Sequence, residues 1–135
     1  MNVLFFLTPK NNVEYLHDTF SVRQALEKME HHRYSSIPVI DKEGRYVETL
    51  STSDLLWFIK GKNLNLEMCE KISIKEIQPH RSNTSIRIDK DVNDLIDLIV
   101  NQNFVPVEDD KGIFIGIITR KSVMDYLIKE INNRN

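Results

Sequence analysis

The strongest constraint on this chain is that it carries the same pattern twice. An apolar-Pro-Val segment, a turn glycine, a hydroxyl residue and an apolar residue follow one another at one spacing in both halves, 68 residues apart. They are Pro38-Val39, Gly44, Ser51 and Leu55, and then Pro106-Val107, Gly112, Thr119 and Val123. Each half is therefore expected to be one copy of a single structural unit.

An amphipathic helix is predicted upstream of the proline in both halves, because apolar residues recur there at i, i+3, i+4 and i+7. They are Val22, Ala25, Leu26 and Met29, and then Val92, Leu95, Ile96 and Ile99. The offset is 70 here, so the second copy is two residues shorter between its helix and its proline. Units this small bury their apolar faces poorly alone. We expect them to pack together with pseudo-twofold symmetry and with ligand clefts at the seam.

Each copy is predicted to run strand, helix, strand, strand, helix, which gives an α+β fold class. The predicted segments are 13–16, 22–32, 37–40, 46–50 and 52–60 in the first copy, and 85–88, 92–101, 104–107, 114–118 and 122–131 in the second. Residues 3–7 are expected to be an apolar packing segment. The predicted domain boundaries are 1–60 for the N-terminal segment with the first copy, 61–75 for a linker, and 76–135 for the second copy.

Composition narrows the classes of partner. With 41% hydrophobic and 28% charged residues in 135, the chain has the make-up of one compact globular domain. A net charge of -2 provides no long-range attraction to nucleic acid or to an anionic membrane. The lone Cys69 excludes an internal disulfide and a cysteine zinc site, and it fits a reducing compartment. We expect a cytoplasmic protein without nucleic-acid or membrane partners.

No catalytic arrangement is visible in the sequence. The histidines lack a partner at a motif spacing, and there is no phosphate-binding glycine loop or dinucleotide fingerprint. The segment His31-His32-Arg33 is expected to be a solvated helix end, because adjacent helix positions diverge and do not converge on one metal ion. The sequence therefore predicts a protein that is not an enzyme and requires no cofactor or metal.

Two strand-to-helix junctions are the best candidates for a binding site. Ser51 and Thr119 each place a hydroxyl at a helix N-terminus, where unpaired N–H groups and the helix dipole favour phosphate. Asp54, one turn after Ser51, can accept ribose hydroxyls; alternatively, Ser51 and Asp54 are simply a helix cap. Arg120 and Lys121 are cations at the positive end of their helix dipole, which is unfavourable. They therefore either neutralise a bound anion or point into water.

Two further cations lie near the expected pocket rims. Lys10 precedes the first copy and Arg81, after His80, precedes the second. Each is a possible phosphate contact or an ordinary loop residue.

At these residues the chain resembles the CBS-domain pair, or Bateman module. The first copy reads Tyr34-Ser35-Ser36-Ile37-Pro38-Val39-Ile40-Asp41 and then Glu48-Thr49-Leu50-Ser51-Thr52-Ser53-Asp54, and the second reads Gly116-Ile117-Ile118-Thr119-Arg120-Lys121-Ser122. The resemblance implies a regulatory sensor that binds AMP, ADP, ATP or S-adenosylmethionine in clefts between the copies. It also implies a homodimer and an output through conformational change or a protein effector.

The resemblance assigns roles by position. Ser51 and Asp54 would hold phosphate and ribose, while Ser35, Ser36 and Ile37, followed by Pro38, would offer backbone groups to the base. In the second copy the equivalent contacts would come from Thr119, Arg120, Lys121 and Ser122 beside Phe104, Val105 and Pro106. Glu48 replaces a family glycine and Ser122 replaces the family acid, so we expect the two clefts to differ in affinity or ligand.

Two alternatives remain open on the sequence. The compact second copy also looks like small bacterial CBS proteins that bind cyclic di-AMP. The substitutions at Glu48 and Ser122 support the other alternative, an interaction or dimerisation module whose pockets hold no ligand.

Overall fold

The computed structural model describes residues 1–134. The chain divides into two compact units. The first-repeat unit comprises residues 14–82, and the second-repeat unit comprises residues 1–13 together with the chain from Asn83 onward. In the described part of the chain, no helix is long and apolar enough to cross a membrane.

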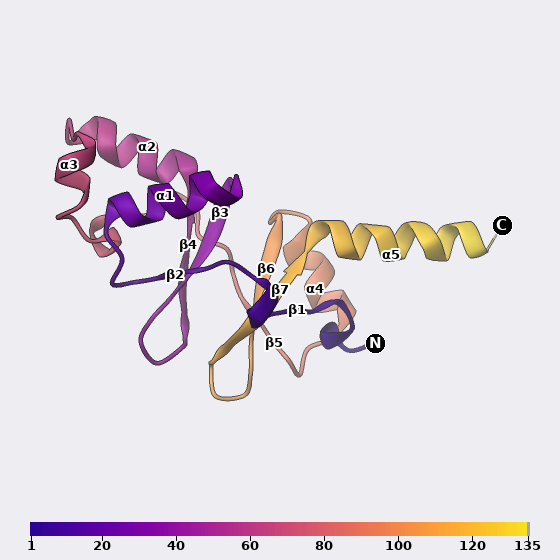
Figure 1. Cartoon of the computed structure of the whole chain (residues 1–135). Helices are drawn as coiled ribbons and strands as arrows, with labels where there is room; N and C mark the ends of the chain where they lie inside the picture. Colours follow the sequence, from indigo (N-terminus) through magenta and orange to yellow (C-terminus); the bar gives the residue numbers. More distant parts are fainter. Residues whose placement is uncertain (135) are drawn as a thin grey trace. The chain divides into compact units, whose positions relative to one another are not determined.

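The first-repeat unit is a three-stranded sheet covered by helices. Its elements are β2 (Leu16–His17), α1 (Val22–His32), β3 (Ser36–Ile40), β4 (Tyr46–Ser51), α2 (Thr52–Gly61), α3 (Leu66–Cys69) and the 3-10 helix η3 (Ile74–Glu76). The sheet order is β2-β3-β4, with β2 parallel and β4 antiparallel to the central β3. The helices α1 and α2 lie along the same side of this sheet (Figure 1).

Local sequence explains how α1 begins and ends. Ser21 caps its N-terminus by accepting a hydrogen bond from the Gln24 N–H, and Gln24 accepts one from the Ser21 N–H. The helix ends at Arg33, which adopts a left-handed conformation with φ 57°. Between these ends, the apolar stripe predicted from the sequence places Val22, Ala25 and Met29 in the core. Burying each large apolar side chain stabilises the fold by about 1.5–3 kcal/mol.

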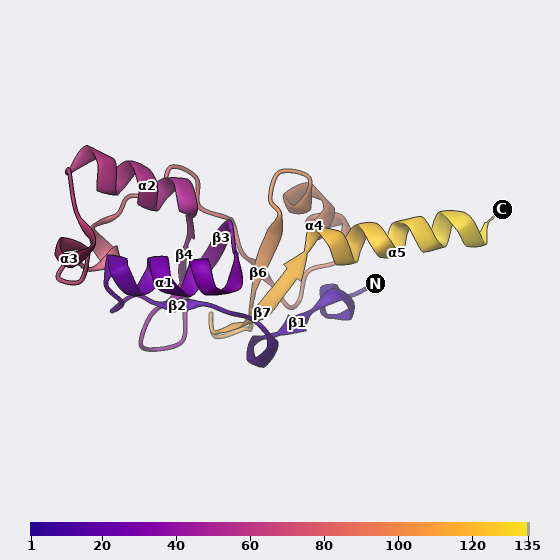
Figure 2. The same ribbon diagram turned by 45° about the horizontal axis from the view of Figure 1, so that its top comes forward.

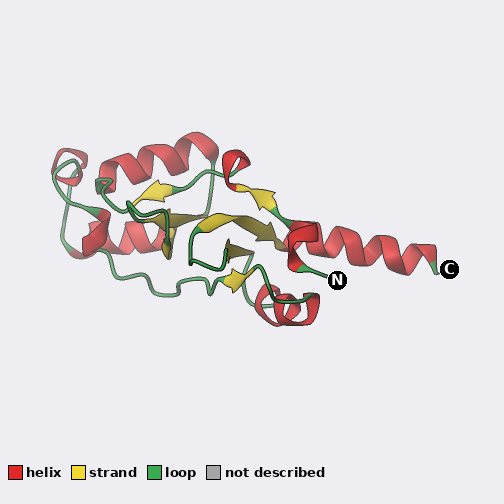
Figure 3. Ribbon diagram, turned by 90° about the horizontal axis from the view of Figure 1, so that it is seen from below, coloured by secondary structure: helices red, strands yellow, loops and turns green. Residues whose placement is uncertain are grey.

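The second-repeat unit has a four-stranded sheet. Its elements are η1 (Val3–Phe6), β1 (Thr8–Pro9), η2 (Lys10–Asn12), β5 (Ile86–Arg87), α4 (Val92–Ile99), β6 (Phe104–Glu108), β7 (Phe114–Thr119) and α5 (Arg120–Asn133). The order is β1-β7-β6-β5. Helix α5 runs on well beyond the end of β7 (Figure 3). The predicted packing segment is confirmed, since Val3 and Phe6 are buried in the core of this unit.

Each unit is completed by the segment that precedes the other repeat. Strand β1 leads into the first repeat, yet it pairs with β7 of the second, with Thr8 opposite Ile117 and Pro9 opposite Gly116 (Figure 2). Conversely, Ser82 leads into the second repeat but accepts a hydrogen bond from the Thr49 N–H in β4 at 2.9 Å. The predicted boundaries at residues 60 and 76 follow the sequence repeat, whereas the compact units follow this exchange of segments.

Gly116 allows β1 to approach β7 closely. Its φ is +151°, and a Cβ built on it would lie 2.2 Å from the Thr8 carbonyl oxygen. Any side chain at this position would therefore push β1 away. Glu48 holds the matching position in the first repeat, where β4 is the edge strand of the three-stranded sheet among the described residues.

The predicted order of elements in both repeats is confirmed, but several bounds are wrong. The strand expected at 13–16 is confined to Leu16–His17, because only these residues pair with β3. The strand expected at 85–88 is likewise Ile86–Arg87. Helix α4 ends at Ile99 and not at residue 101, and α5 begins at Arg120 and not at residue 122, because Thr119 is its N-cap.

Candidate functional site

Ser51 and Asp54 form a reciprocal cap at the start of α2. The Ser51 Oγ accepts a hydrogen bond from the Asp54 N–H at 3.0 Å, and the Asp54 Oδ2 accepts one from the Ser51 N–H at 2.9 Å. The capping alternative left open by the sequence is therefore confirmed. Such a cap fixes the two side chains in place, so it is compatible with a ligand that uses both.

Asp54 has a second partner outside the helix. Its Oδ1 accepts a hydrogen bond from the His80 N–H at 2.9 Å, and the residue is only 8% exposed. An ionised carboxylate offers about four acceptor positions. Each oxygen of Asp54 accepts one backbone hydrogen bond and has a second lone pair, which suits a pair of vicinal hydroxyls.

The structure brings the other predicted first-repeat residues to the same place. The Ser35 carbonyl accepts a hydrogen bond from the Thr52 N–H at 2.9 Å, and Ser36 lies opposite Ser51 in the β3–β4 pair. Ile37 and Pro38 are buried, so they have only backbone groups to offer. Arg81, expected at the rim of the second copy, belongs instead to the first-repeat unit, where it is exposed and directly follows His80, the residue bound to Asp54.

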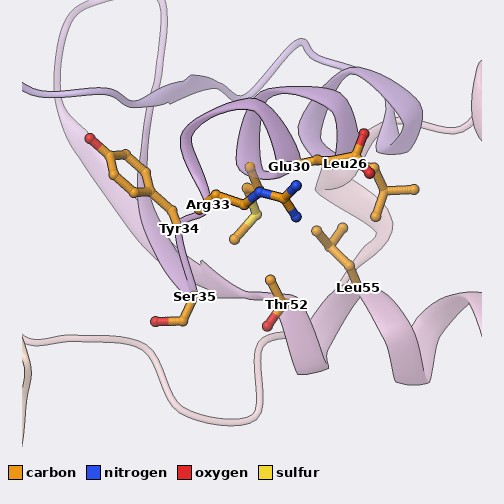
Figure 4. A pocket seen from close by; sticks show the side chains of 8 residues that line it. Leu26, Glu30, Arg33, Tyr34, Ser35, Thr52 and Leu55 are labelled. Atoms are coloured by element: carbon orange, nitrogen blue, oxygen red, sulfur yellow. The ribbon is translucent and has the colours of Figure 1, made fainter.

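A pocket of about 400 Å³ adjoins this junction. Figure 4 shows the residues that line it, which are Leu26, Met29, Glu30, Arg33, Tyr34, Ser35, Thr52 and Leu55. Apolar side chains from α1 and α2 face it, and the Arg33 side chain extends toward them. The sequence analysis did not predict Glu30, Arg33 or Tyr34 as pocket residues, and it treated the segment that contains Arg33 as a solvated helix end. The left-handed Arg33 turns the chain there, and no turn glycine signals it.

Glu48 adds negative charge near Asp54. Burial raises the pKa of Glu48, and the neighbouring carboxylates of Asp54 and Asp18 raise it further. A phosphate close to these groups would be repelled unless Glu48 takes up a proton or a cation lies nearby. The expectation that Glu48 distinguishes the first repeat thus has a physical basis.

The second-repeat junction has the same backbone frame but different side-chain chemistry. The Arg120 N–H donates to the Asn103 carbonyl at 2.9 Å, which matches the bond from Thr52 to Ser35. Thr119 caps α5 by accepting a hydrogen bond from the Ser122 N–H at 3.1 Å. Ser122 then donates its own hydroxyl back to the Thr119 carbonyl at 2.9 Å. Ser122 occupies the position that Asp54 has in the first repeat, and as a serine it supplies a hydroxyl in place of the carboxylate.

The two cations at the start of α5 have partners within the protein. The Arg120 Nε donates to the Ile99 carbonyl at the end of α4 at 2.9 Å. The Lys121 Nζ lies 2.8 Å from the Asp125 carboxylate, and this contact raises the pKa of Lys121. A bound anion is thus not required to explain either charge. Lys10, expected at the rim of the first copy, lies half-buried in η2 and belongs to the second-repeat unit.

Two segments of the chain, residues 7–61 and 74–129, match the family model described as CBS domain. The chain belongs to the CBS-domain family. Its two matched segments coincide with the two repeats, so the tandem CBS arrangement predicted from the sequence is confirmed. Proteins of this family with paired repeats are regulatory.

Known proteins similar to this CBS-domain chain bind adenine nucleotides. Cyclic di-AMP receptor B of Bacillus subtilis (strain 168) is 25% identical over 131 residues, which cover 96% of this chain and 88% of that protein. The crystal structure of CbpB in complex with c-di-AMP is 25% identical with a TM-score of 0.88, covering 98% of this chain and 88% of that one. The crystal structure of CBSX2 in complex with AMP is 27% identical with a TM-score of 0.73, covering 95% and 96%.

Proposed function

We propose that this CBS-domain chain is a regulatory sensor that binds an adenine nucleotide at the Ser51–Asp54 junction. The observation that carries the proposal is the buried Asp54 carboxylate, which is held by two backbone N–H groups and keeps acceptor capacity for ribose hydroxyls. Adenine ligands in two similar structures support the ligand class. We propose binding without catalysis, in the cytoplasm where such nucleotides circulate.

In this proposal the neighbouring residues contact different parts of the ligand. Ser51 and the N-terminus of α2 receive a phosphate, with Arg81 as its counter-charge. Backbone groups of Ser35, Ser36, Ile37 and Pro38 contact the base. Binding at Asp54 acts on the segment that includes His80, and this segment joins the two repeats.

Cyclic di-AMP is the second candidate ligand. A receptor for it aligns with 96% of this chain. Cyclic di-AMP carries two adenosyl groups. The number of chains bound per ligand molecule therefore shows whether one chain or two contact the same ligand.

A thermal-shift screen with AMP, ADP, ATP, S-adenosylmethionine, cyclic di-AMP and GMP tests the proposal, followed by calorimetric titration of any hit. A ligand that prefers the folded state raises the melting temperature by an amount that grows with concentration. We expect a saturable shift with one adenine ligand and none with GMP. Nucleotide-free, folded protein that shows no shift with any ligand would instead favour an interaction module with empty pockets.

We also propose that two copies of the chain associate as a homodimer through the last helices of the repeats. Met124, Ile128 and Ile131 are about half exposed on α5, and Leu56 and Trp57 are similarly exposed on α2. Exposed apolar stripes of this kind mark interaction sites. Sedimentation of the wild type and of Ile128→Glu tests this: the wild type should be a dimer and the variant a monomer, and a monomeric wild type would leave the stripe to a protein effector.

A further inference from the structure

Gln102 is a buried amide in the second-repeat unit, in the turn between α4 and β6. It is 9% exposed. Its Oε1 accepts a hydrogen bond from the Thr84 N–H at 2.8 Å, and its Nε2 donates to the Thr84 carbonyl at 3.0 Å and to the Phe104 carbonyl at 3.2 Å. The side chain is therefore fixed by three bonds and fills the space beside the start of β6.

The Phe104 carbonyl faces this amide. Because the Arg120 N–H donates to the Asn103 carbonyl, the Phe104–Thr119 pair is of the non-hydrogen-bonded type, and the Phe104 carbonyl points away from β7. It accepts hydrogen bonds from Gln102 Nε2 at 3.2 Å and from Asn83 Nδ2 at 3.1 Å. A carbonyl oxygen has two lone pairs, so two amide donors occupy its accepting capacity.

The first repeat has a different residue at the matching position. Ser35 and Asn103 correspond because each accepts the N–H of the first residue of the following helix. Tyr34 is therefore the counterpart of Gln102. Tyr34 is 37% exposed and belongs to the wall of the pocket, and its hydroxyl points away from Leu26 and Leu55 (Figure 4).

We propose that Gln102 closes the second repeat to an adenine base, so that each chain binds its nucleotide at the first repeat alone. This inference rests on the proposed function. To hydrogen-bond to the Phe104 carbonyl, an amino group of the base would have to displace the buried Gln102 amide. The backbone partners of this amide at Thr84 would then be unpaired, which is unfavourable. At the same junction Ser122, whose hydroxyl donates to the Thr119 carbonyl, offers no carboxylate to ribose hydroxyls.

Calorimetry on a matched pair of variants tests the proposal. The probe is whichever of AMP, ADP, ATP, S-adenosylmethionine and cyclic di-AMP binds the wild type most tightly. Ser51→Ala and Thr119→Ala each remove the N-cap hydroxyl of the equivalent helix, so both lose a comparable structural contact. We expect Ser51→Ala to weaken binding at least tenfold and Thr119→Ala to leave it within twofold. Wild-type protein should bind no more than one nucleotide per chain.

The side-chain amide of Gln102 provides a direct readout in ¹⁵N correlation spectra of the same titration. Its resonance should not move, while the backbone amides of Ser36 and His80 should. More than one nucleotide per chain, a tenfold loss in Thr119→Ala, or a saturable shift of the Gln102 amide would overturn the inference and leave the proposed function standing. Wild-type protein that binds none of AMP, ADP, ATP, S-adenosylmethionine and cyclic di-AMP would overturn both.

Discussion

Asp54 in α2 and His80, 26 residues further along the chain, are joined by a hydrogen bond of 2.9 Å between the Asp54 Oδ1 and the His80 N–H. The carboxylate proposed to hold ribose therefore also fixes the segment that leads into the second repeat. A ligand that forms hydrogen bonds with Asp54 would change the hydrogen bonding of this segment. The bond between Asp54 and His80 therefore connects the proposed ribose site to the segment between the repeats.

Replacing Asp54 with alanine should lower stability as well as affinity. The change leaves the Ser51 and His80 N–H groups without their carboxylate partner, and we expect a loss of about 2 kcal/mol in the free energy of unfolding. Asp94→Ala is the matched control, because Asp94 also reaches back to the N-cap of its helix but is exposed. The control should lose only about 0.5 kcal/mol in urea denaturation. Equal losses would show that the bond to His80 adds nothing.

Neutralising Glu48 should stabilise the protein at neutral pH. Its pKa is raised in the fold, so the folded state binds the proton more tightly and stability falls as pH rises through the interval between the unfolded and folded values. Glu48→Gln removes this loss. Because the side chain is partly exposed to solvent, we expect a gain of a few tenths of a kcal/mol at pH 7 that disappears at low pH. Denaturation curves at several pH values measure it.

Glu43→Gln, in the exposed turn between β3 and β4, is the control for Glu48. It makes the same change of charge away from Asp54 and should alter stability by less than about 0.5 kcal/mol. A gain at Glu48 that is independent of pH would contradict the electrostatic explanation.

Arg120 and Lys121 should differ in their contributions to stability although they are adjacent and carry the same charge. Arg120 donates to the buried end of α4, so Arg120→Ala should cost about 1.5 kcal/mol. Lys121 makes an exposed i,i+4 pair with Asp125, so Lys121→Ala should cost no more than about 0.5 kcal/mol. Thermal unfolding of the two variants checks the difference. The reverse order would mean that the bond to Ile99 contributes little in solution.

Alanine substitutions at two glycines should act in opposite directions. Gly116→Ala places a Cβ against the Thr8 carbonyl in a backbone region that disfavours side chains, so we expect a loss of at least about 2 kcal/mol. Gly61→Ala, at the end of α2, meets no atom of residues 1–134 within 4 Å and should gain up to about 0.5 kcal/mol. Calorimetric melting temperatures measure both. A harmless Gly116→Ala would show that β1 does not need its close approach to β7.

The repeat and the order of elements could be predicted from the sequence because their signals are local. The stripes of α1 and α4 recur every three or four residues, and the hydroxyls of Ser51 and Thr119 cap the helices that follow them directly. The family motif then indicated which residues of the first repeat would come together, and the contacts of Ser35 and Ser51 with α2 place them there.

Contacts between distant positions were decided only by the tertiary structure. Nothing near Thr8 in the sequence indicates that β1 pairs with β7. Likewise, nothing near Arg120 indicates that its guanidinium donates a hydrogen bond to the Ile99 carbonyl. Gln102 looks like an ordinary surface residue until its amide meets Thr84 and Phe104. Local spacing determines which helices and strands form and how they are capped, whereas the partners of a buried polar group depend on which segments the fold brings beside it.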